Sequence, residues 1–286
     1  MTWAIDVQGL RFRYRGSPRW ALKDVDLRVS ERETVLVTGP SGSGKSTLIR
    51  ALNGLIPDFH EGEVRGTVRV LGRDVLALRA NQVATFVGTV FQFPEDQIIA
   101  SEVRRDVAFG LENLGWERED IDQRVEEALQ AVRLLEFGDR EVSSLSGGQM
   151  QRLALASTIA MGPRVLLFDE PASELDPRGR REFLQAFERL SGTGSHTLLL
   201  TDHRLADLLG IVDRLVVLLE GRVAFEGPPE EVMGRPELAG LGVEVPQAIQ
   251  VWHSLHSVGP DAPCPLTSEE VIDRLLEERR RLLVES

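Results

Sequence analysis

The segment GPSGSGKS at residues 39–46 constrains the fold more than any other part of the sequence. It follows the short apolar run TVLVT at residues 34–38, which predicts a strand, and a helix is expected from about Lys45 to Asn53. A glycine-rich turn between a strand and a helix is the setting of a P-loop, because glycines let successive backbone N–H groups face phosphate oxygens. The sequence therefore predicts an α/β protein that binds a nucleoside triphosphate.

Two side chains of this loop carry specific chemistry. Lys45 supplies a point charge to the β- and γ-phosphates, and the hydroxyl of Ser46 is a ligand for Mg²⁺. Lys45 is one of only two lysines in the chain, the other being Lys23, so its retention indicates a chemical role. The predicted nucleotide-binding residues of the loop are Gly39, Pro40, Ser41, Gly42, Ser43, Gly44, Lys45, Ser46 and Thr47.

The segment RVLLFDEP at residues 164–171 is an apolar strand that ends in two adjacent carboxylates. At the end of a strand the chain turns, so both side chains can reach one ligand. Asp169 is placed to hold Mg²⁺ or its water, and Glu170 to orient or deprotonate an attacking water. An apolar run with Asp-Glu is a weak motif alone, but beside a P-loop it predicts hydrolysis as well as binding.

A second phosphate-binding feature occurs in LSGGQMQRLALA at residues 145–156. Ser146 is a good helix N-cap, and Gln149 can complete a capping box with it. Gly147 and Gly148 leave backbone N–H groups uncovered at a helix N-terminus, where the helix dipole favours an anion. One chain thus carries two predicted phosphate sites, which calls for an explanation.

Strands alternate with helices along the chain, which indicates an α/β core with a mainly parallel sheet. A charged helical stretch at about 98–152 interrupts this core and predicts a helical subdomain within a domain of residues 1–227. After Gly227 prolines break the chain into short pieces, and residues 228–286 form a predicted C-terminal extension. Beyond the P-loop elements, strands are predicted at 5–10, 25–29, 62–76 (a hairpin), 83–91, 164–168, 196–201 and 215–225, and helices near 178–190 and from Thr267.

The predicted final helix begins with a second capping-box pattern, Thr267 to Glu270. Its apolar positions form one stripe, so we expect it to pack against another surface. A solvated charged face explains the run RLLEERRRLL most simply, and partner binding is the alternative. The stripe consists of Val271, Ile272, Leu275, Leu276, Leu282 and Leu283.

Composition limits the class of protein. The net charge is −12, from 45 acidic against 33 basic residues, which opposes a sequence-independent grip on nucleic acid. No stretch approaches the ~18 apolar residues of a membrane span. The single cysteine, Cys264, excludes an internal disulfide, fits a reducing cytoplasm and is expected to be inert.

Taken in order, these motifs resemble those of the ATP-binding cassette (ABC) ATPases over about residues 3–225. The resemblance implies a P-loop NTPase core with a mainly parallel sheet, a small antiparallel β subdomain, a helical subdomain insertion and, here, a small helical C-terminal extension. It implies that Gln92 in VFQFPEDQ senses Mg²⁺ and the attacking water, and that His203 in TDH contacts the γ-phosphate. Tyr14 in FRYRG would stack on adenine, with Phe12 and Trp20 as nearby alternatives. The expected catalytic residues are Lys45, Glu170 and His203, and the expected magnesium ligands are Ser46, Gln92 and Asp169.

The resemblance also explains why there are two phosphate sites. In this family two ATPase protomers close head to tail, and the second helix N-terminus faces the nucleotide held by the other chain. The residues expected to act on the partner's nucleotide are Ser146, Gly147, Gly148, Gln149 and Asp176. One departure is visible, because family members commonly have alanine where this chain has Glu174.

A finer resemblance is to the ATPases of energy-coupling factor transporters, in LNGLIPDFHEGEVRGTVRVLGRDV, VFQFPEDQI and the tail from LAGLGVEVPQAIQVWHSL to PLTSEEVIDRLL. It implies a peripheral protein on the cytoplasmic face of the membrane that uses ATP and Mg²⁺ to drive uptake of a vitamin or of cobalt or nickel ions. The implied partners are a second ATPase protomer, identical or homologous, a transmembrane coupling subunit and a substrate-binding membrane subunit, with no nucleic acid. The extension would lie at the ATPase dimer interface.

Two alternatives stay open at this point. One is the ATPase of another transporter type with a regulatory tail, and the other is a soluble ABC ATPase acting on nucleic acid or ribosomes. His60, Glu61 and Glu63 in HEGE also suggest a metal site, but a polar turn facing solvent is favoured.

Overall fold

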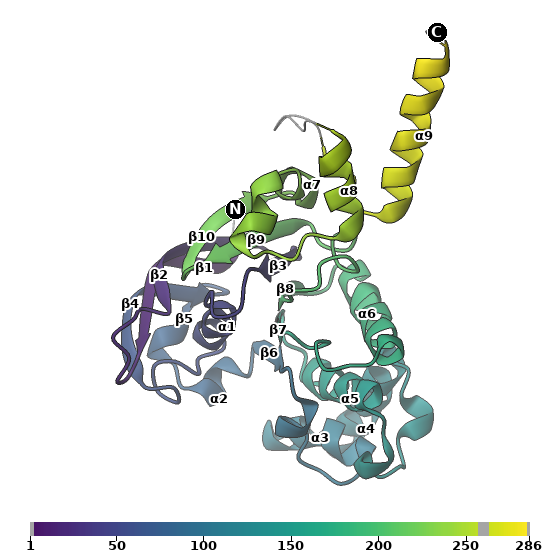
Figure 1. Cartoon of the computed structure of the whole chain (residues 1–286). Coiled ribbons are helices and arrows are strands. Elements are labelled where there is room, and N and C mark those ends of the chain that lie inside the picture. The colour runs from purple at the N-terminus through teal and green to yellow at the C-terminus, as the bar shows by residue number, and fades with distance from the viewer. Residues whose placement is uncertain (1–2, 257–262, 285–286) are drawn as a thin grey trace.

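The computed structural model describes residues 3–256 and 263–284, which fold around two β-sheets (Figure 1). The larger sheet has six strands in the order β10-β9-β3-β8-β7-β6, and its pairs are parallel except for the antiparallel edge strand β10. This confirms the predicted α/β fold with a mainly parallel sheet. Its strands are β3 (Thr34–Thr38), β6 (Val87–Val90), β7 (Val165–Asp169), β8 (Thr197–Thr201), β9 (Arg214–Leu219) and β10 (Arg222–Gly227).

The central strands are buried on both faces, which is why they read as continuous apolar runs. Side chains alternate between the two faces. In β3, Leu36 packs into one core with the helical part of the chain, whereas Val35 and Val37 pack into a second core on the opposite face. The sheet therefore separates two hydrophobic cores.

The smaller sheet is antiparallel, in the order β2-β1-β4-β5, and it packs over the second core. Its first strand runs from Trp3 to Tyr14, longer than the predicted 5–10, because a bulge at Gly9 (φ 55°) lets the pairing continue. Helix α1 (Lys45–Leu52) contributes buried Leu48 and Ile49 to the same core. The sheet consists of β1 (Trp3–Tyr14), β2 (Leu22–Ser30), β4 (Gly62–Val70) and β5 (Arg73–Asp74).

Helices α3 (Val103–Asn113), α4 (Arg118–Ala131) and α5 (Gly147–Ala160) form the helical region between β6 and β7, at the foot of Figure 1. Helix α5 then leads directly back to the sheet and packs against α6 (Pro177–Gly192). The prediction of a strand over 83–91 was too long. Residues 80–83 form helix α2 (Ala80–Val83) instead, where the Arg79 N–H donates to the Gln82 side chain.

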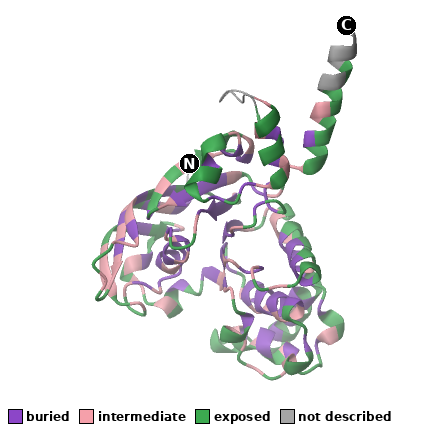
Figure 2. Ribbon diagram, in the orientation of Figure 1, coloured by how far each residue is buried: buried purple, intermediate pink, exposed green. Residues whose placement is uncertain are grey.

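The C-terminal extension contains α7 (Pro229–Met233), α8 (Gln247–Leu255) and α9 (Ser268–Val284). Met233, Leu238 and Ile249 are buried in the first core, so most of the extension packs on the body of the fold. Helix α9 instead projects away from that body, and most of its described residues are exposed (Figure 2).

The start of α9 resembles the predicted capping box with one difference. The Glu270 N–H donates to the Thr267 hydroxyl, but the Glu270 carboxylate accepts from the Leu266 N–H rather than from that of Thr267. In the predicted stripe Val271 is buried, Leu275 is half-buried, and Ile272 and Leu276 are 55% and 44% exposed. The side chains of Leu282 and Leu283 lie outside the described residues.

Cys264 is buried beside α8, where its Sγ lies 3.9 Å from His253 Nε2. Burial raises the pKa of its thiol to about 11, which is consistent with the expected inert residue. In the part of the chain that the structure describes, no helix has the length and apolar character needed to cross a membrane.

Candidate functional site

The P-loop connects β3 to α1 and leaves the N-terminus of that helix open. Gly44 is the N-cap residue with φ 110°, and no side chain caps the first turn. Gly39 has φ 144°, and a Cβ there would lie 2.1 Å from the carbonyl oxygen of Leu218. Only glycine fits that position, so the sequence of the loop follows from its path. The open helix end presents unpaired N–H groups, as an anion site requires.

Lys45 lies in the first turn of α1 and is 6% exposed. Its Nζ donates to the Gly39 carbonyl at 2.9 Å and to the Pro40 carbonyl at 3.4 Å, and it lies 3.4 Å from Glu170 Oε1. A phosphate oxygen bound in the loop would compete with these acceptors for the ammonium group. The lysine thus connects the P-loop to the carboxylates at the end of β7.

Asp169 ends β7, and its Oδ1 accepts hydrogen bonds from Ser46 Oγ and Thr201 Oγ1, both at 3.0 Å. Burial raises the pKa of this carboxyl, the two hydroxyls oppose that rise, and the negative charge of Glu170 adds to it. The two motifs that the sequence separates by more than a hundred residues therefore meet in one hydrogen bond, between Ser46 and Asp169.

Glu170 has an unusual backbone for its residue type. Its φ is 47°, in the left-handed region, and its N–H donates to both the carbonyl and the hydroxyl oxygen of Thr201 at 3.1 Å. This conformation costs about 1–3 kcal/mol in a residue other than glycine. It turns the side chain towards Lys45 and His203, whose Nδ1 lies 3.6 Å from Glu170 Oε2.

The donor set at this point fits a hard divalent cation. Ser46 and Asp169 offer a hydroxyl and a carboxylate oxygen within hydrogen-bonding distance of each other, the oxygen ligands that Mg²⁺ prefers. Across the described residues, no group of three or more His, Cys, Asp or Glu side chains is arranged to hold a metal. In the HEGE turn, Glu61 pairs with Arg15, and Glu63 with Arg13 and Arg65, which favours the solvent-facing interpretation.

Tyr14 lies at the end of β1, beside α1. Its hydroxyl is 3.0 Å from Thr47 Oγ1 and accepts a hydrogen bond from Arg50 at 2.9 Å. Phe12, one alternative for stacking on a base, is completely buried against Tyr14 in the core. Trp20, the other alternative, lies under the guanidinium groups of Arg13 and Arg65. Tyr14 is therefore the best-placed aromatic residue beside the loop.

Gln92 follows β6, and its amide donates to Glu174 Oε1 at 3.2 Å. The residue that departs from the family pattern thus contacts a residue of the predicted site. Two glutamines that we did not predict hold the adjacent backbone: Gln151 Nε2 donates to the Phe91 carbonyl at 2.8 Å, and the Phe91 N–H donates to Gln97 at 3.3 Å. A single glutamine carries no sequence signal of such a role.

The predicted capping box at the start of α5 is confirmed. The Gln149 N–H donates to Ser146 Oγ at 3.3 Å, and the Ser146 N–H donates to Gln149 Oε1 at 2.8 Å. Gly148 packs directly on α6, where a Cβ would lie 2.7 Å from Gly179 Cα. Asp176 caps α6 by accepting from the Gly179 N–H at 2.6 Å.

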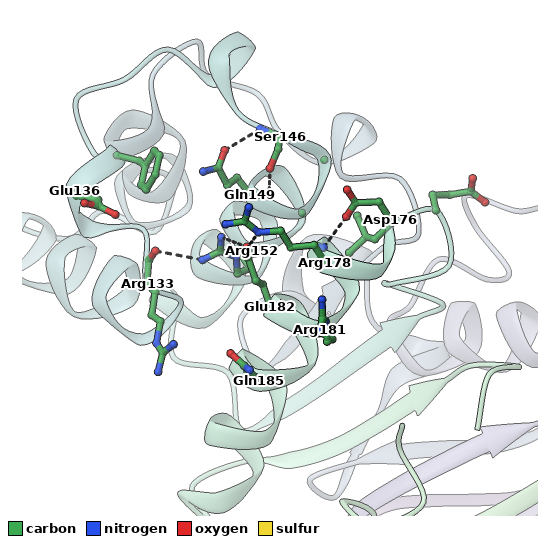
Figure 3. Close-up of a pocket in the computed structure, with 16 residues that line it drawn as sticks. Arg133, Glu136, Ser146, Gln149, Arg152, Asp176, Arg178, Arg181, Glu182 and Gln185 are labelled. Carbon is green, nitrogen blue, oxygen red and sulfur yellow. Dashed lines mark hydrogen bonds and ion pairs between the residues drawn. The ribbon is translucent and has the colours of Figure 1, made fainter. Parts of the chain in front are cut away.

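These two helix N-termini line one cavity of about 1000 Å³ (Figure 3). No P-loop residue lines this cavity, so the N-terminus of α5 lies apart from that of α1 within the described chain. The lining residues are Arg133, Glu136, Phe137, Ser146, Gly147, Gly148, Gln149, Arg152, Glu174, Leu175, Asp176, Arg178, Gly179, Arg181, Glu182 and Gln185.

Comparison with known proteins places these features in a family context. The family model for the ABC transporter matches residues 22–173. A putative ABC transporter ATP-binding protein of Pyrococcus abyssi is 40% identical over 277 residues, which cover 96% of this chain and 99% of that protein. A relative of the same description from Methanosarcina acetivorans is 40% identical over 94% of this chain, but the chain spans only 41% of its length.

Two solved structures are similar over most of the chain. One is CbiO1 from Clostridium perfringens, described as part of the ABC transporter complex CbiONQ, with a TM-score of 0.75, 27% identity, and coverage of 88% of this chain and 100% of that one. The other is an ATP-binding cassette in a dimeric post-hydrolysis state bound to ADP and Pi, with a TM-score of 0.68, 25% identity, and coverage of 79% and 98%.

Proposed function

Because the chain belongs to the ABC transporter family and has the fold of its ATPase, we propose that it hydrolyses ATP to drive an energy-coupling factor type importer. The observation that supports this most strongly is the meeting of Lys45, Asp169 and Glu170 at the mouth of the P-loop. Together they provide a cation for phosphate, an oxygen donor for a metal and a base for water.

Binding uses the open end of α1. The N–H groups of the P-loop and Lys45 hold the β- and γ-phosphates, and Tyr14 stacks on the adenine ring. Lys45 exchanges its contacts with the Gly39 and Pro40 carbonyl groups for the phosphate oxygens, which are stronger charged acceptors.

Hydrolysis uses Glu170 as the general base. Its carboxylate accepts a proton from water as the water oxygen attacks the γ-phosphorus, and the bond to the bridging oxygen of ADP breaks. His203, beside Glu170, donates to the γ-phosphate and holds it in line. Ser46, Asp169 and Gln92 would hold Mg²⁺, which when bound neutralises charge on the β- and γ-phosphates.

The second helix end explains the assembly. In a head-to-tail pair, the α5 N-terminus of one protomer, with Ser146 and Gly148, completes the nucleotide site of the other, and Asp176 lies at the same seam. ATP then favours closure because it contacts both chains in the closed state only. The dimeric state named for one structural neighbour supports this arrangement.

The transporter type is argued from the extension and from the neighbour that is part of CbiONQ. On this proposal the chain docks on a transmembrane coupling subunit at the cytoplasmic face of the membrane, and a separate membrane subunit selects a vitamin or a cobalt or nickel ion. The exposed Ile272 and Leu276 on α9 pack against the second protomer.

Copurification tests the transporter type. The tagged chain should be isolated from its native membranes with two membrane subunits and should hydrolyse ATP in that complex. Retention of ATPase activity with only soluble nucleic-acid or ribosomal partners would overturn the transporter assignment.

The role of α9 needs a point variant rather than a truncation. Deletion of residues 228–286 would expose the core around Met233 and Ile249. Replacing both Ile272 and Leu276 with Asp, with Asp273→Asn as the matched control, should weaken ATP-dependent dimerisation. An unchanged dimer with altered basal ATPase activity would favour the regulatory tail of another transporter type.

A further inference from the structure

We propose that Arg180 is a positioning residue that holds His203 in its catalytic place. This inference rests on the proposed function, because it assigns a role within the same ATP-hydrolysing site. Nothing in the sequence distinguishes Arg180, which stands in the arginine-rich segment PRGRREF at the start of α6.

The guanidinium group of Arg180 is buried where several loops meet. The residue is 5% exposed. Its Nη1 donates to Asp202 Oδ2 at 3.2 Å, and its Nη2 donates to the Arg204 carbonyl at 3.1 Å. These two partners are the residues on either side of His203, so one rigid planar group grips both ends of that turn.

A second set of contacts extends this grip. Arg180 Nη1 also lies 3.4 Å from the carbonyl of Ala172, two residues after Glu170, and Nε donates to Asp207 Oδ2 at 3.0 Å. Asp202 Oδ1 in turn accepts from the Arg204 N–H at 2.8 Å. The turn after β8 and the turn after β7 are therefore connected through one side chain.

His203 itself makes only longer contacts. Its Nδ1 lies 3.6 Å from Glu170 and 3.9 Å from Asp202, and its side chain is 40% exposed. Its place is thus set by its backbone, which Arg180 and Asp202 hold. A displacement of about 1 Å in a reacting group reduces a rate by up to about 100-fold, so this indirect hold bears on turnover.

A contribution to stability is a weaker explanation for the ion pair between Arg180 and Asp202. A buried ion pair gains little over apolar residues of similar volume, because both charges lose their hydration. Arg180 also follows Gly179, which contacts Gly148 at the start of α5. The residue therefore lies between the helix end that would face the partner's nucleotide and the histidine of its own site.

The first test separates turnover from nucleotide binding. Arg180→Met should lower kcat by about 10-fold to 100-fold while the KM for ATP and the affinity for a fluorescent ATP analogue change less than about twofold. Arg180→Lys should recover part of kcat, and Arg189→Met, on the exposed side of the same helix, should match the wild type. Equal loss of kcat and of ATP affinity would overturn the proposal.

A second variant allows for the instability of an unpaired buried Asp202. Arg180→Met combined with Asp202→Leu removes both charges and should recover the melting temperature without recovering kcat. Recovery of both quantities would show that the arginine acts only through stability, and would overturn the proposal.

A double-mutant cycle identifies the residue through which Arg180 acts. In single-turnover assays, Arg180→Met should change the rate less than about twofold in a His203→Ala background, because the group that it positions is gone. Rate losses that multiply would overturn the proposal. A wild-type protein that does not hydrolyse ATP would instead refute the proposed function, so the two failures can be distinguished.

Discussion

The helices α1 and α5 both begin at a glycine-rich turn, but they treat their first N–H groups in opposite ways. Helix α1 starts at Gly44 without any side-chain cap and places Lys45 in its first turn. Helix α5 starts at Ser146, whose side chain and that of Gln149 satisfy two of the N–H groups reciprocally. The N-terminus of α1 is therefore uncapped and carries a lysine, whereas the N–H groups at the N-terminus of α5 are partly satisfied by its own side chains.

This difference suggests a division of labour. An open helix end with a lysine binds phosphate in a single chain, whereas a capped end gains less from an anion and needs one already held in place. We therefore expect nucleotide to bind first at α1 and only then to engage α5 of a partner.

Glu170→Gln should lower turnover by about 100-fold to 10,000-fold, because it removes the proposed general base while the amide keeps the shape of the side chain. Both helix ends should then stay occupied, and an ATP-bound dimer should accumulate. Phosphate release and size-exclusion chromatography with ATP measure the two effects, with Glu188→Gln on the exposed side of α6 as the control. Turnover at the wild-type rate would remove Glu170 from the role of base.

Lys45→Ala should weaken ATP binding by about 10-fold to 100-fold, the value of a hydrogen bond to a charged group. Because α1 acts first, the variant should also fail to dimerise with ATP. Calorimetric titration of the monomer measures the affinity. The only other lysine provides the control: Lys23→Ala should bind as the wild type does, and equal losses in the two variants would contradict the assignment.

Gly148→Ala should disturb the N-terminus of α5 and leave that of α1 intact. The new Cβ would lie 2.7 Å from Gly179 Cα, so α5 must shift on α6 at a cost of about 1–3 kcal/mol. ATP binding by the monomer should be preserved while ATP-dependent dimerisation is lost, as chromatography and titration would show. Gly192→Ala, which meets nothing within 4 Å, is the control. A loss of monomer ATP affinity in Gly148→Ala would refute the division between the two ends.

Asp169→Asn should have the smallest of these effects, a modest rise in the melting temperature. Because burial raises the pKa of Asp169, its contribution to stability is present at low pH and is lost as pH rises through the folded-state pKa. The advantage of the uncharged variant should thus be small at about pH 4 and larger at about pH 7.5, above the ordinary aspartate pKa of about 3.9. Thermal denaturation at the two pH values tests the sign, and a variant less stable at the higher pH would contradict it.

Much of the fold was predictable because local signals agreed with the final contacts. The run TVLVT, the P-loop glycines and the capping box of Ser146 are each defined within a few residues. The buried strands were equally clear, since both of their faces are apolar. The strand over 83–91 was predicted too long because Val83 belongs to a short helix, and a single buried valine in a helix cannot be told from one in a strand by sequence.

The rest of the site depends on contacts between distant residues. Gln97 and Gln151 support the backbone before Gln92, and Arg180 joins two turns that the sequence separates by some thirty residues. Such side chains look ordinary in sequence, because their hydrogen-bond partners are known only once the chain is folded. The helix α9 was predicted from its stripe, but its projection from the body was not.

The left-handed backbone of Glu170 has an evolutionary consequence. Glycine adopts φ 47° freely, so Glu170→Gly would relieve the backbone strain, and Asp169→Asn would remove a charge that burial disfavours. On the proposed mechanism these two substitutions would inactivate the enzyme while stabilising its fold, so variants selected only for yield or heat resistance would accumulate inactivating changes. High expression of a variant of this chain is therefore no evidence that it still works.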